Sequence, residues 1–343
     1  MNMRLIWGAL IVIVAAVVWF VFGGKPLKEA AKPGLTPVTF VSDWKAQAEH
    51  GGFYEALALG YYKDAGLDVT IHQGGPDVNV PQLLATGAAQ FGIGSNSPIA
   101  INNVTAGVPA TAVAAIFQKD PQVLMAHPRS DLASLADIKG KPVLISDATI
   151  SAFWPWLKAK YGFTDDQIRK YTGNIAPFLS DKTAIQEGYL TSEPYSYEQE
   201  MKEKPLVFLL ADSGYTGYAS FVLASNDLIA KKPEIVQAFV DATVKGWYSY
   251  LYGDPAPANA LILKDNPDMT QAIIDQSIAK MKEYGIVDSG DTLKSGIGAM
   301  TAERWQAFFD EMVKDGVYPA TVDYKKAYTD QFINKGVGLD LKK

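Results

Sequence analysis

The chain has 343 residues, 48% of them hydrophobic and 20% charged, which is ordinary for a globular protein large enough for two lobes. A net charge of -6 argues against a nucleic-acid partner, since phosphate neutralisation needs a basic face. The absence of cysteine excludes disulfides, thiolate metal sites, a thiol nucleophile and a lipid-modified cysteine anchor. The three histidines lack HExxH-type spacing, so we expect neither a metal nor a cofactor.

The amino terminus carries an apolar run, residues 5–22, directly behind Arg4. About 18 apolar residues are enough for a minimal membrane span. An uncleaved anchor, a cleaved signal peptide ending near Gly23 and a buried core helix are the alternatives. Either of the first two would export the rest of the chain. Residues 25–37 are rich in Pro, Gly, Lys and Ala and are typical of a tether, so we assign 1–36 to anchor or signal plus tether.

The first structural unit follows the tether. Residues 38–41 favour a strand, the loop after it carries Trp44 and His50, and residues 53–61 form an apolar stripe at helical spacing. A glycine stop leads into a second strand, 67–71, which completes a βαβ unit. The Trp44 loop therefore lies at the carboxyl end of a strand, where open α/β sheets bind ligands.

Further βα units follow at short spacing. Helices are predicted at 81–86 and 98–105, and strands at 91–93 and 110–117, which indicates a mainly parallel sheet covered by helices on both faces. Ser95 and Asn96 precede the second helix, where free backbone N–H groups can hold a ligand oxygen. Simple helix capping explains the same residues.

Residues 121–221 are interpreted as a second region, and residues 221–223 lead back to sequence that resembles the first region. The predicted elements of the second region are strands at 123–126, 143–146 and 206–210 and helical segments at 154–161 and 165–171. A strand at 221–223 and helices within 226–252, 267–284 and 301–315 make up the remainder.

The second region carries its own polar and aromatic candidates. Thr149 and Ser151 lie at a strand-to-helix turn and could form a polar half-site, with Trp154 as a wall. Glu193 and Tyr195 occupy another turn, for which an ordinary surface carboxylate is the alternative. Tyr215 and Tyr218 fall near the return to the first region, where tyrosines often only pack.

Enzymatic signatures are missing from the sequence. There is no GxSxG elbow, no paired histidines beside a nucleophile and no nucleotide-binding glycine motif. We therefore predict that the protein is not an enzyme and has no catalytic residue.

Residues 60–69, GYYKDAGLDV, together with the Trp44 loop and His50, carry a family resemblance. The sequence resembles the periplasmic solute-binding proteins of ABC importers, in the group that binds thiamine pyrimidine precursors, sulfonates, taurine and nitrate. The resemblance implies an α/β, two-lobed, type II binding-protein fold with two chain crossings and a ligand cleft between the lobes. Lobe 1 would comprise 37–120 and 222–343, and lobe 2 would comprise 121–221.

The resemblance also implies a role. The protein would be periplasmic, tethered to the inner membrane or released, and monomeric; it would pass a small planar nitrogen-containing or anionic solute to an ABC permease and its ATPase. A sensory or scaffold module and a pyrimidine-synthase-like enzyme are the alternatives, and the missing cysteines argue against the enzyme. The loop lacks the Pro and Asn of the family's W-x-P-N-x-x-H pattern, which argues against formylaminopyrimidine.

We expect Trp44 to stack on the ligand, His50 to bind its edge and Glu193 to accept a hydrogen bond from it. The full set of predicted ligand-binding residues is Trp44, His50, Ser95, Asn96, Thr149, Ser151, Trp154, Glu193, Tyr195, Tyr215 and Tyr218.

Overall fold

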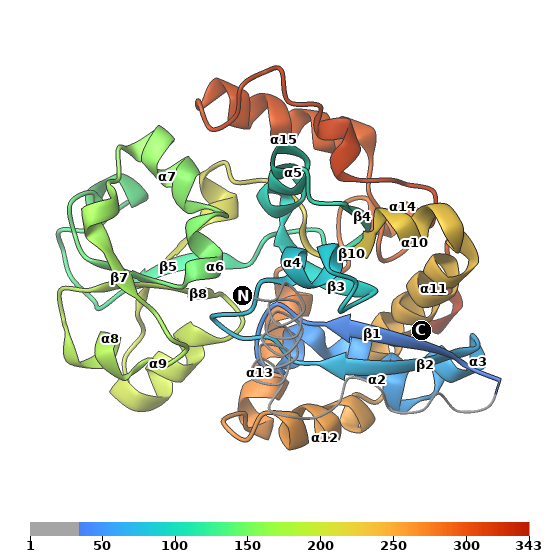
Figure 1. Ribbon diagram of the computed structural model, residues 1–343. Helices are drawn as coiled ribbons and strands as arrows, with labels where there is room; N and C mark the ends of the chain where they lie inside the picture. Colours follow the sequence, from blue (N-terminus) through green and yellow to red (C-terminus); the bar gives the residue numbers. More distant parts are fainter. Residues whose placement is uncertain (1–33, 343) are drawn as a thin grey trace, which may run out of the picture.

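A computed structural model describes residues 34–342 and divides them between two five-stranded sheets (Figure 1). The predicted anchor or signal segment lies outside the described residues. Among the residues that are described, no helix is both long and apolar enough to cross a membrane.

The first sheet has the strand order β2-β1-β3-β10-β4. Its strands are β1 (Thr36–Val41), β2 (Leu67–His72), β3 (Phe91–Asn96), β4 (Ala110–Phe117) and β10 (Ala219–Ser225). Strand β1 pairs in parallel with β2 and β3, whereas β10 runs antiparallel between β3 and β4. Four of the five strands therefore share one direction, as the βα alternation predicts.

The second sheet repeats this arrangement with the order β7-β6-β8-β5-β9. Its strands are β5 (Gln122–Ala126), β6 (Val143–Ile145), β7 (Ile168–Lys170), β8 (Ile185–Tyr189) and β9 (Leu206–Leu209). Here β6 pairs in parallel with β7 and β8, and β5 is the antiparallel strand between β8 and β9.

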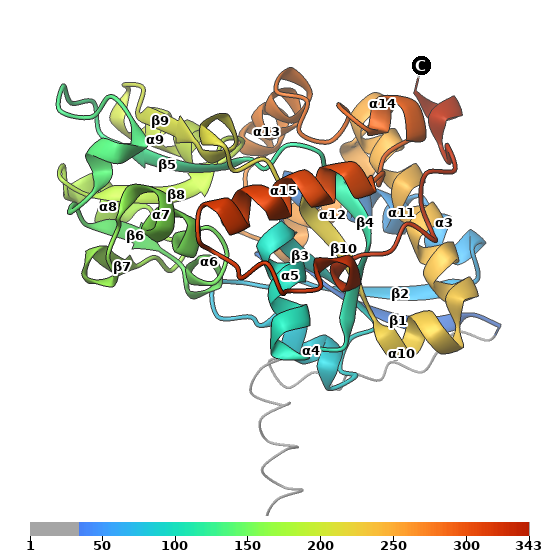
Figure 2. The same cartoon turned by 90° about the horizontal axis from the view of Figure 1, so that it is seen from above.

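The chain crosses between the sheets twice, after β4 and before β10. Each crossing supplies the antiparallel strand of the sheet that it enters, β5 in one case and β10 in the other. The two sheets with their helices form two lobes (Figures 1 and 2), and the predicted two-lobed α/β fold with a cleft between the lobes is confirmed.

Most of the helices flank the sheets, and several of those near the carboxyl terminus cover the first lobe. The α-helices are α2 (Gly51–Ala58), α3 (Tyr61–Asp64), α4 (Val80–Ala85), α5 (Ser97–Ala106), α6 (Asp147–Ile150), α7 (Trp154–Tyr161), α8 (Ala176–Ser180), α9 (Glu193–Met201), α10 (Asn226–Lys231), α11 (Pro233–Tyr252), α12 (Ala256–Asp265), α13 (Gln271–Glu283), α14 (Thr292–Ser295) and α15 (Ala302–Lys314). The 3-10 helices are η1 (Ala48–His50), η2 (Leu135–Ile138), η3 (Asp165–Gln167), η4 (Leu210–Ser213), η5 (Tyr324–Ala327) and η6 (Leu339–Leu341).

Helices α2 and α11 pack closely because glycines line their contact. A Cβ atom on Gly246 would lie 2.2 Å from the carbonyl oxygen of Gly52, and one on Gly52 would lie 2.2 Å from the Trp247 ring. This contact fixes α2, the helix that follows the Trp44 loop, against α11, the longest helix among the described residues.

Two predicted helical segments are corrected by the structure. Residues 165–171 form η3 followed by β7, because pairing with β6 overrides the local helical preference. The apolar stripe at 53–61 belongs to two helices, α2 and α3, which Gly60 separates at φ 80°.

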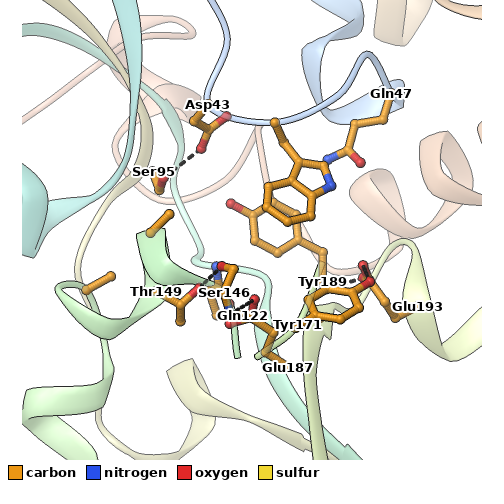
Figure 3. A pocket seen from close by; sticks show the side chains of 14 residues that line it. Asp43, Gln47, Ser95, Gln122, Ser146, Thr149, Tyr171, Glu187, Tyr189 and Glu193 are labelled. Atoms are coloured by element: carbon orange, nitrogen blue, oxygen red, sulfur yellow. Dashed lines mark hydrogen bonds between the residues drawn. The ribbon is translucent and has the colours of Figure 1, made fainter. Parts of the chain in front are cut away.

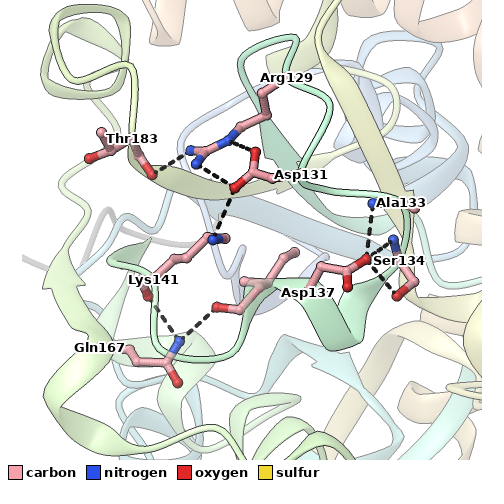
Figure 4. Close-up of polar contacts among 9 residues, drawn as sticks. Arg129, Asp131, Ala133, Ser134, Asp137, Lys141, Gln167 and Thr183 are labelled. Atoms are coloured by element: carbon pink, nitrogen blue, oxygen red, sulfur yellow. Dashed lines mark hydrogen bonds and ion pairs between the residues drawn. The ribbon is translucent and has the colours of Figure 1, made fainter.

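A network of polar contacts holds the segment of lobe 2 that connects β5 to β6 (Figure 4). Arg129 forms a bidentate pair with Asp131 at 2.6 and 2.8 Å, and Lys141 adds a third contact at 3.2 Å. The Gln167 amide donates to the carbonyls of Ile138 and Lys141 at 3.1 and 2.9 Å. The loop between these strands is therefore held at both ends.

Candidate functional site

A cavity of about 610 Å³, part of it open to solvent, lies between the two lobes (Figure 3). Its walls come from the carboxyl ends of β1, β3, β6 and β7 and from the β8–α9 segment, where this class of sheet binds ligands. The lining residues are Asp43, Trp44, Gln47, Ser95, Gln122, Ser146, Ala148, Thr149, Ala152, Tyr171, Glu187, Gly188, Tyr189 and Glu193.

Lobe 1 contributes one wall, formed by the loop after β1 and the end of β3. The Asp43 carboxylate accepts a hydrogen bond from the Ser95 hydroxyl at 2.7 Å and lies 3.3 Å from His50 Nε2. The Ser42 hydroxyl donates to the Trp44 carbonyl at 2.7 Å and accepts from the Gly74 N–H at 3.0 Å. These contacts hold the loop, and with it the Trp44 ring, in one conformation.

The opposite wall, formed by lobe 2, contains the buried carboxyl group of Glu187. Glu187 is 5% exposed, and one of its carboxylate oxygens accepts the Ser146 backbone N–H at 2.8 Å. Among the described residues, its other oxygen, Oε2, has no hydrogen-bond partner. Burial raises the pKa of Glu187 to about 7, although the hydroxyls of Thr149 and Ser146 partly oppose this. An acceptor that has lost water without gaining a partner costs about 1–3 kcal/mol, which a donor on a ligand would recover.

Glu193 lies on the same wall but is fully engaged within the protein. One oxygen accepts from the Tyr171 hydroxyl at 3.3 Å and the other accepts from the Tyr189 backbone N–H at 2.7 Å. Burial raises its pKa to about 7 as well, and the neighbouring carboxyls of Glu49 and Glu187 contribute to this rise in pKa.

Two aromatic rings from opposite lobes are stacked on each other at the cavity. Trp44 and Tyr171 are nearly parallel, with an interplanar angle of 19° and ring centroids 6.2 Å apart. Trp44 also packs against an apolar cluster of lobe 2 that contains Tyr171 and Phe178. A change in the distance between the lobes therefore changes the gap between these two rings.

The cavity carries acceptors and aromatic rings but no positive charge. Its lining includes the carboxyls of Asp43, Glu187 and Glu193, and no Lys, Arg or His. Such a lining suits a planar ligand with N–H donors and disfavours a sulfonate or nitrate, whose charge would meet carboxylates. In the part of the chain that the structure covers, no group of three His, Asp or Glu side chains is placed to hold a metal ion.

The lobes also touch beside the cavity. Glu49 of lobe 1 is buried and accepts a hydrogen bond from the Thr191 hydroxyl of lobe 2. The Ser277 hydroxyl donates to the Thr191 carbonyl at 2.6 Å. Burial raises the pKa of Glu49. The structure therefore represents a closed arrangement of the lobes.

Four of the predicted ligand-binding residues line the cavity: Trp44, Ser95, Thr149 and Glu193. The other seven have no place on its wall. His50 is buried behind it and faces Asp43, Asn96 is buried at the end of β3, and Tyr195 lies on α9. Ser151 lines a neighbouring groove instead.

Three aromatic residues of this group pack within the protein. Trp154 is fully buried and donates from its indole N–H to Asp165 at 2.9 Å. Tyr215 packs against Trp156 with ring centroids 5.1 Å apart. Tyr218 lies under the Arg304 guanidinium, 4.1 Å from its ring centroid, and donates to Asp291.

Sequence reasoning missed Asp43, Gln47, Gln122, Ser146, Tyr171, Glu187 and Tyr189. Asp43 and Gln47 flank Trp44 in a loop already singled out, so the loop position was an available signal. Glu187 and Tyr189 lie on β8, which was not predicted because a carboxylate interrupts its apolar pattern.

The family follows from comparison with known sequences. The NMT1/THI5-like family model matches residues 47–258, more than half of the chain, and the protein belongs to this family. The cavity described above lies largely within this region, with Asp43 and Trp44 just before it.

Individual relatives are distant but cover most of the chain. The riboflavin-binding protein RibY of Chloroflexus aurantiacus is 25% identical over 89% of this chain and 88% of its own. The formylaminopyrimidine-binding protein of Halalkalibacterium halodurans is 24% identical over 79% and 83%, respectively. A pyrimidine phosphate synthase of Candida albicans is 23% identical over 64% and 69%.

A solved structure shares the fold. The alkanesulfonate-binding protein SsuA of Xanthomonas axonopodis pv. citri, bound to MOPS, superimposes with a TM-score of 0.62 over 88% of this chain and 99% of its own. Its sequence identity is 14%, so the likeness concerns the fold.

Proposed function

We propose that the protein is the exported solute-binding component of an ABC importer and that it captures a planar, nitrogen-containing heterocycle between its lobes. The observation that carries the choice of ligand is Glu187. Glu187 lines a cavity that has aromatic walls and no positive charge, and one of its carboxylate oxygens is buried without a hydrogen-bond partner among the described residues. An N–H donor on a ring stacked against Trp44 satisfies this oxygen.

The comparisons support the same class of ligand. Two of the relatives are named for binding riboflavin and formylaminopyrimidine, which are both nitrogen heterocycles. Delivery to a permease, the periplasmic location, the membrane tether and the monomeric state belong to this proposal.

The proposed role of His50 changes with the geometry. Its Nε2 faces Asp43 at 3.3 Å behind the wall of the cavity. We propose that His50 orients Asp43, and that Glu187 takes the acceptor role predicted for Glu193.

The ligand class is tested by titrating the purified protein with three probes: riboflavin, 4-amino-5-hydroxymethyl-2-methylpyrimidine and an alkanesulfonate. We expect quenching of tryptophan fluorescence and micromolar or tighter binding with at least one heterocycle, and no binding of the sulfonate. Tight binding of the sulfonate alone would overturn the proposal.

Two alternative functions make different predictions. A sensory or scaffold module binds the same ligand but leaves uptake unchanged when the gene is deleted. A pyrimidine synthase releases product, which mass spectrometry of the incubated protein detects. We expect reduced uptake on deletion and no product.

A further inference from the structure

A second hollow continues from the ligand cavity along lobe 1. It encloses about 1450 Å³, partly open to solvent, between helices α4 and α5 of lobe 1 and helix α6 of lobe 2. We call it the α4–α5 groove. Asp43, Ser95 and Ala148 line both the groove and the cavity, so a ligand longer than the cavity passes from one to the other along these residues.

The groove has a mainly apolar lining with several polar side chains and no cationic one. Amides and hydroxyls are contributed by Asn79, Asn102, Asn103 and Ser151, and carboxylates by Asp77 and Asp147, while no Lys, Arg or His lines it. The nearby Lys170 is already paired with Asp77 at 3.3 Å and Asp147 at 3.2 Å.

Asn103 is the residue that indicates a missing ligand group. Asn103 is among the residues that line the groove and is 3% exposed, and its amide nitrogen is buried without a hydrogen-bond partner among the described residues. A buried donor without a partner costs about 1–3 kcal/mol, and a hydroxyl oxygen on a ligand would satisfy it.

The neighbouring Asn102 shows the contrast. Its amide donates to the Ser151 carbonyl of lobe 2 at 2.8 Å and accepts from the Tyr318 hydroxyl at 2.9 Å. Asn102 therefore holds the lobes together across the groove, whereas Asn103 retains a free donor.

We infer that the ligand carries an uncharged, hydroxylated chain on its ring, and that this chain lies in the α4–α5 groove with one oxygen accepting from Asn103. This inference rests on the proposed function, because the cavity next to the groove must hold the ring. A phosphate at the end of the chain would meet Asp77 and Asp147, of whose two negative charges Lys170 balances only one, so the phosphate should weaken binding.

The test compares three flavins that share one ring: lumiflavin, which lacks the chain, riboflavin, and riboflavin 5′-phosphate. We expect riboflavin to bind at least tenfold more tightly than each of the other two in calorimetric titrations. Equal affinities for riboflavin and lumiflavin, or tighter binding of the phosphate, would overturn the inference.

Substitutions test whether the gain in affinity from the hydroxylated chain comes from the α4–α5 groove. Asn103→Leu should bring the affinity for riboflavin to that for lumiflavin, leave lumiflavin binding unchanged, and keep or raise the melting temperature because it removes an unpaired buried donor. Ser151→Phe, at an exposed position, places a ring in the groove and should also lower the affinity for riboflavin without lowering that for lumiflavin. This variant replaces Asn103→Leu if that protein fails to fold. Trp44→Ala is the matched control and should weaken both flavins alike. Loss of both flavins in Asn103→Leu, with the fold intact, would contradict the assignment.

The two proposals fail in different ways. Binding of the aminopyrimidine alone, whose substituent is a single hydroxymethyl group, overturns the groove inference and leaves the proposed function standing. Binding of the alkanesulfonate alone overturns both.

Discussion

Glu187 and Glu193 lie on one wall of the cavity but differ in what remains for a ligand. Both oxygens of Glu193 accept hydrogen bonds from the protein, whereas Oε2 of Glu187 accepts none from the described residues. Burial raises the pKa of each to about 7, so each changes charge near neutral pH. Substituting each carboxyl in turn and measuring the ligand affinity therefore distinguishes their roles.

Glu187→Gln should weaken binding of a donor heterocycle about tenfold or more, because an amide N–H would then face the ligand's own N–H. Glu193→Gln should change the affinity less, about threefold, since it disturbs only contacts within the wall. Calorimetric titration of both variants measures this difference. The opposite ranking would return the acceptor role to Glu193.

The pH dependence of binding offers an independent check. A ligand N–H favours ionised Glu187, so the affinity should rise as the pH passes upward through about 7 and level off above it. Glu187→Gln should lose most of this dependence. An affinity that falls over the same range would mean that a protonated Glu187 donates to the ligand.

At the scale of elements, the close contact of α2 with α11 supports the Trp44 loop. Gly246→Ala gains about 1 kcal/mol in helix propensity but places a methyl group 2.2 Å from a backbone oxygen that has little freedom to move. Overpacking costs about 1–3 kcal/mol or more, so we expect a lower melting temperature. Gly75→Ala is the control, because no atom lies within 4 Å of its added methyl group. A parental melting temperature for Gly246→Ala would contradict the packing described here.

Most elements could be predicted from local pattern alone. The βα alternation of lobe 1 and the amphipathic helices α11, α13 and α15 follow apolar periodicity, which the sequence displays directly. Strands β7 and β8 could not be predicted in this way: β7 is stabilised by pairing with β6, and Glu187 interrupts the apolar pattern of β8.

The site was only partly predictable for a related reason. Trp44 and Ser95 lie at strand ends, which topology marks as ligand-binding positions. By contrast, Trp154, Tyr215 and Tyr218 were attractive by residue type, but burial among other rings gives them a packing role. Residue type does not reveal which side chain keeps a hydrogen-bonding atom free.

At the scale of the whole molecule, several contacts outside the cavity join the lobes, among them Trp156 with Asp315 at 3.0 Å, Lys170 with Asp77 at 3.3 Å and Asn102 with Ser151 at 2.8 Å. The hydrogen bond from Thr191 to Glu49 is another, and we expect it to break when the lobes move apart. We expect small-angle scattering to give a smaller radius of gyration with saturating ligand than without it. Thr191→Val should raise the radius of the ligand-free protein and leave that of the saturated protein nearly unchanged. A radius that is independent of ligand would favour a rigid, non-transport role.

Stability should depend on pH because several buried carboxyls titrate abnormally. Burial raises the pKa of Glu55, Asp120, Glu187 and Glu193 to about 7, compared with about 4 in an unfolded chain. Between these values the folded protein binds more protons, so the free energy of unfolding falls as the pH rises. Calorimetry should show a melting temperature lower by about 5 °C or more at pH 8 than at pH 5. Higher stability at pH 8 would mean that these groups are ionised and solvated in the native state.

The two crossings of the chain between the lobes determine the order in which the two sheets can be completed during biosynthesis. All strands of the second sheet lie in one continuous stretch, from β5 to β9, so this sheet has its complete set of strands once residue 209 has emerged from the ribosome. The first sheet must wait for β10, because β3 and β4 have no direct pairing and remain separate until residue 225 is available. The lobe begun first is therefore completed last, and the unpaired edges of β3 and β4 stay open while the whole of the second sheet is being synthesised.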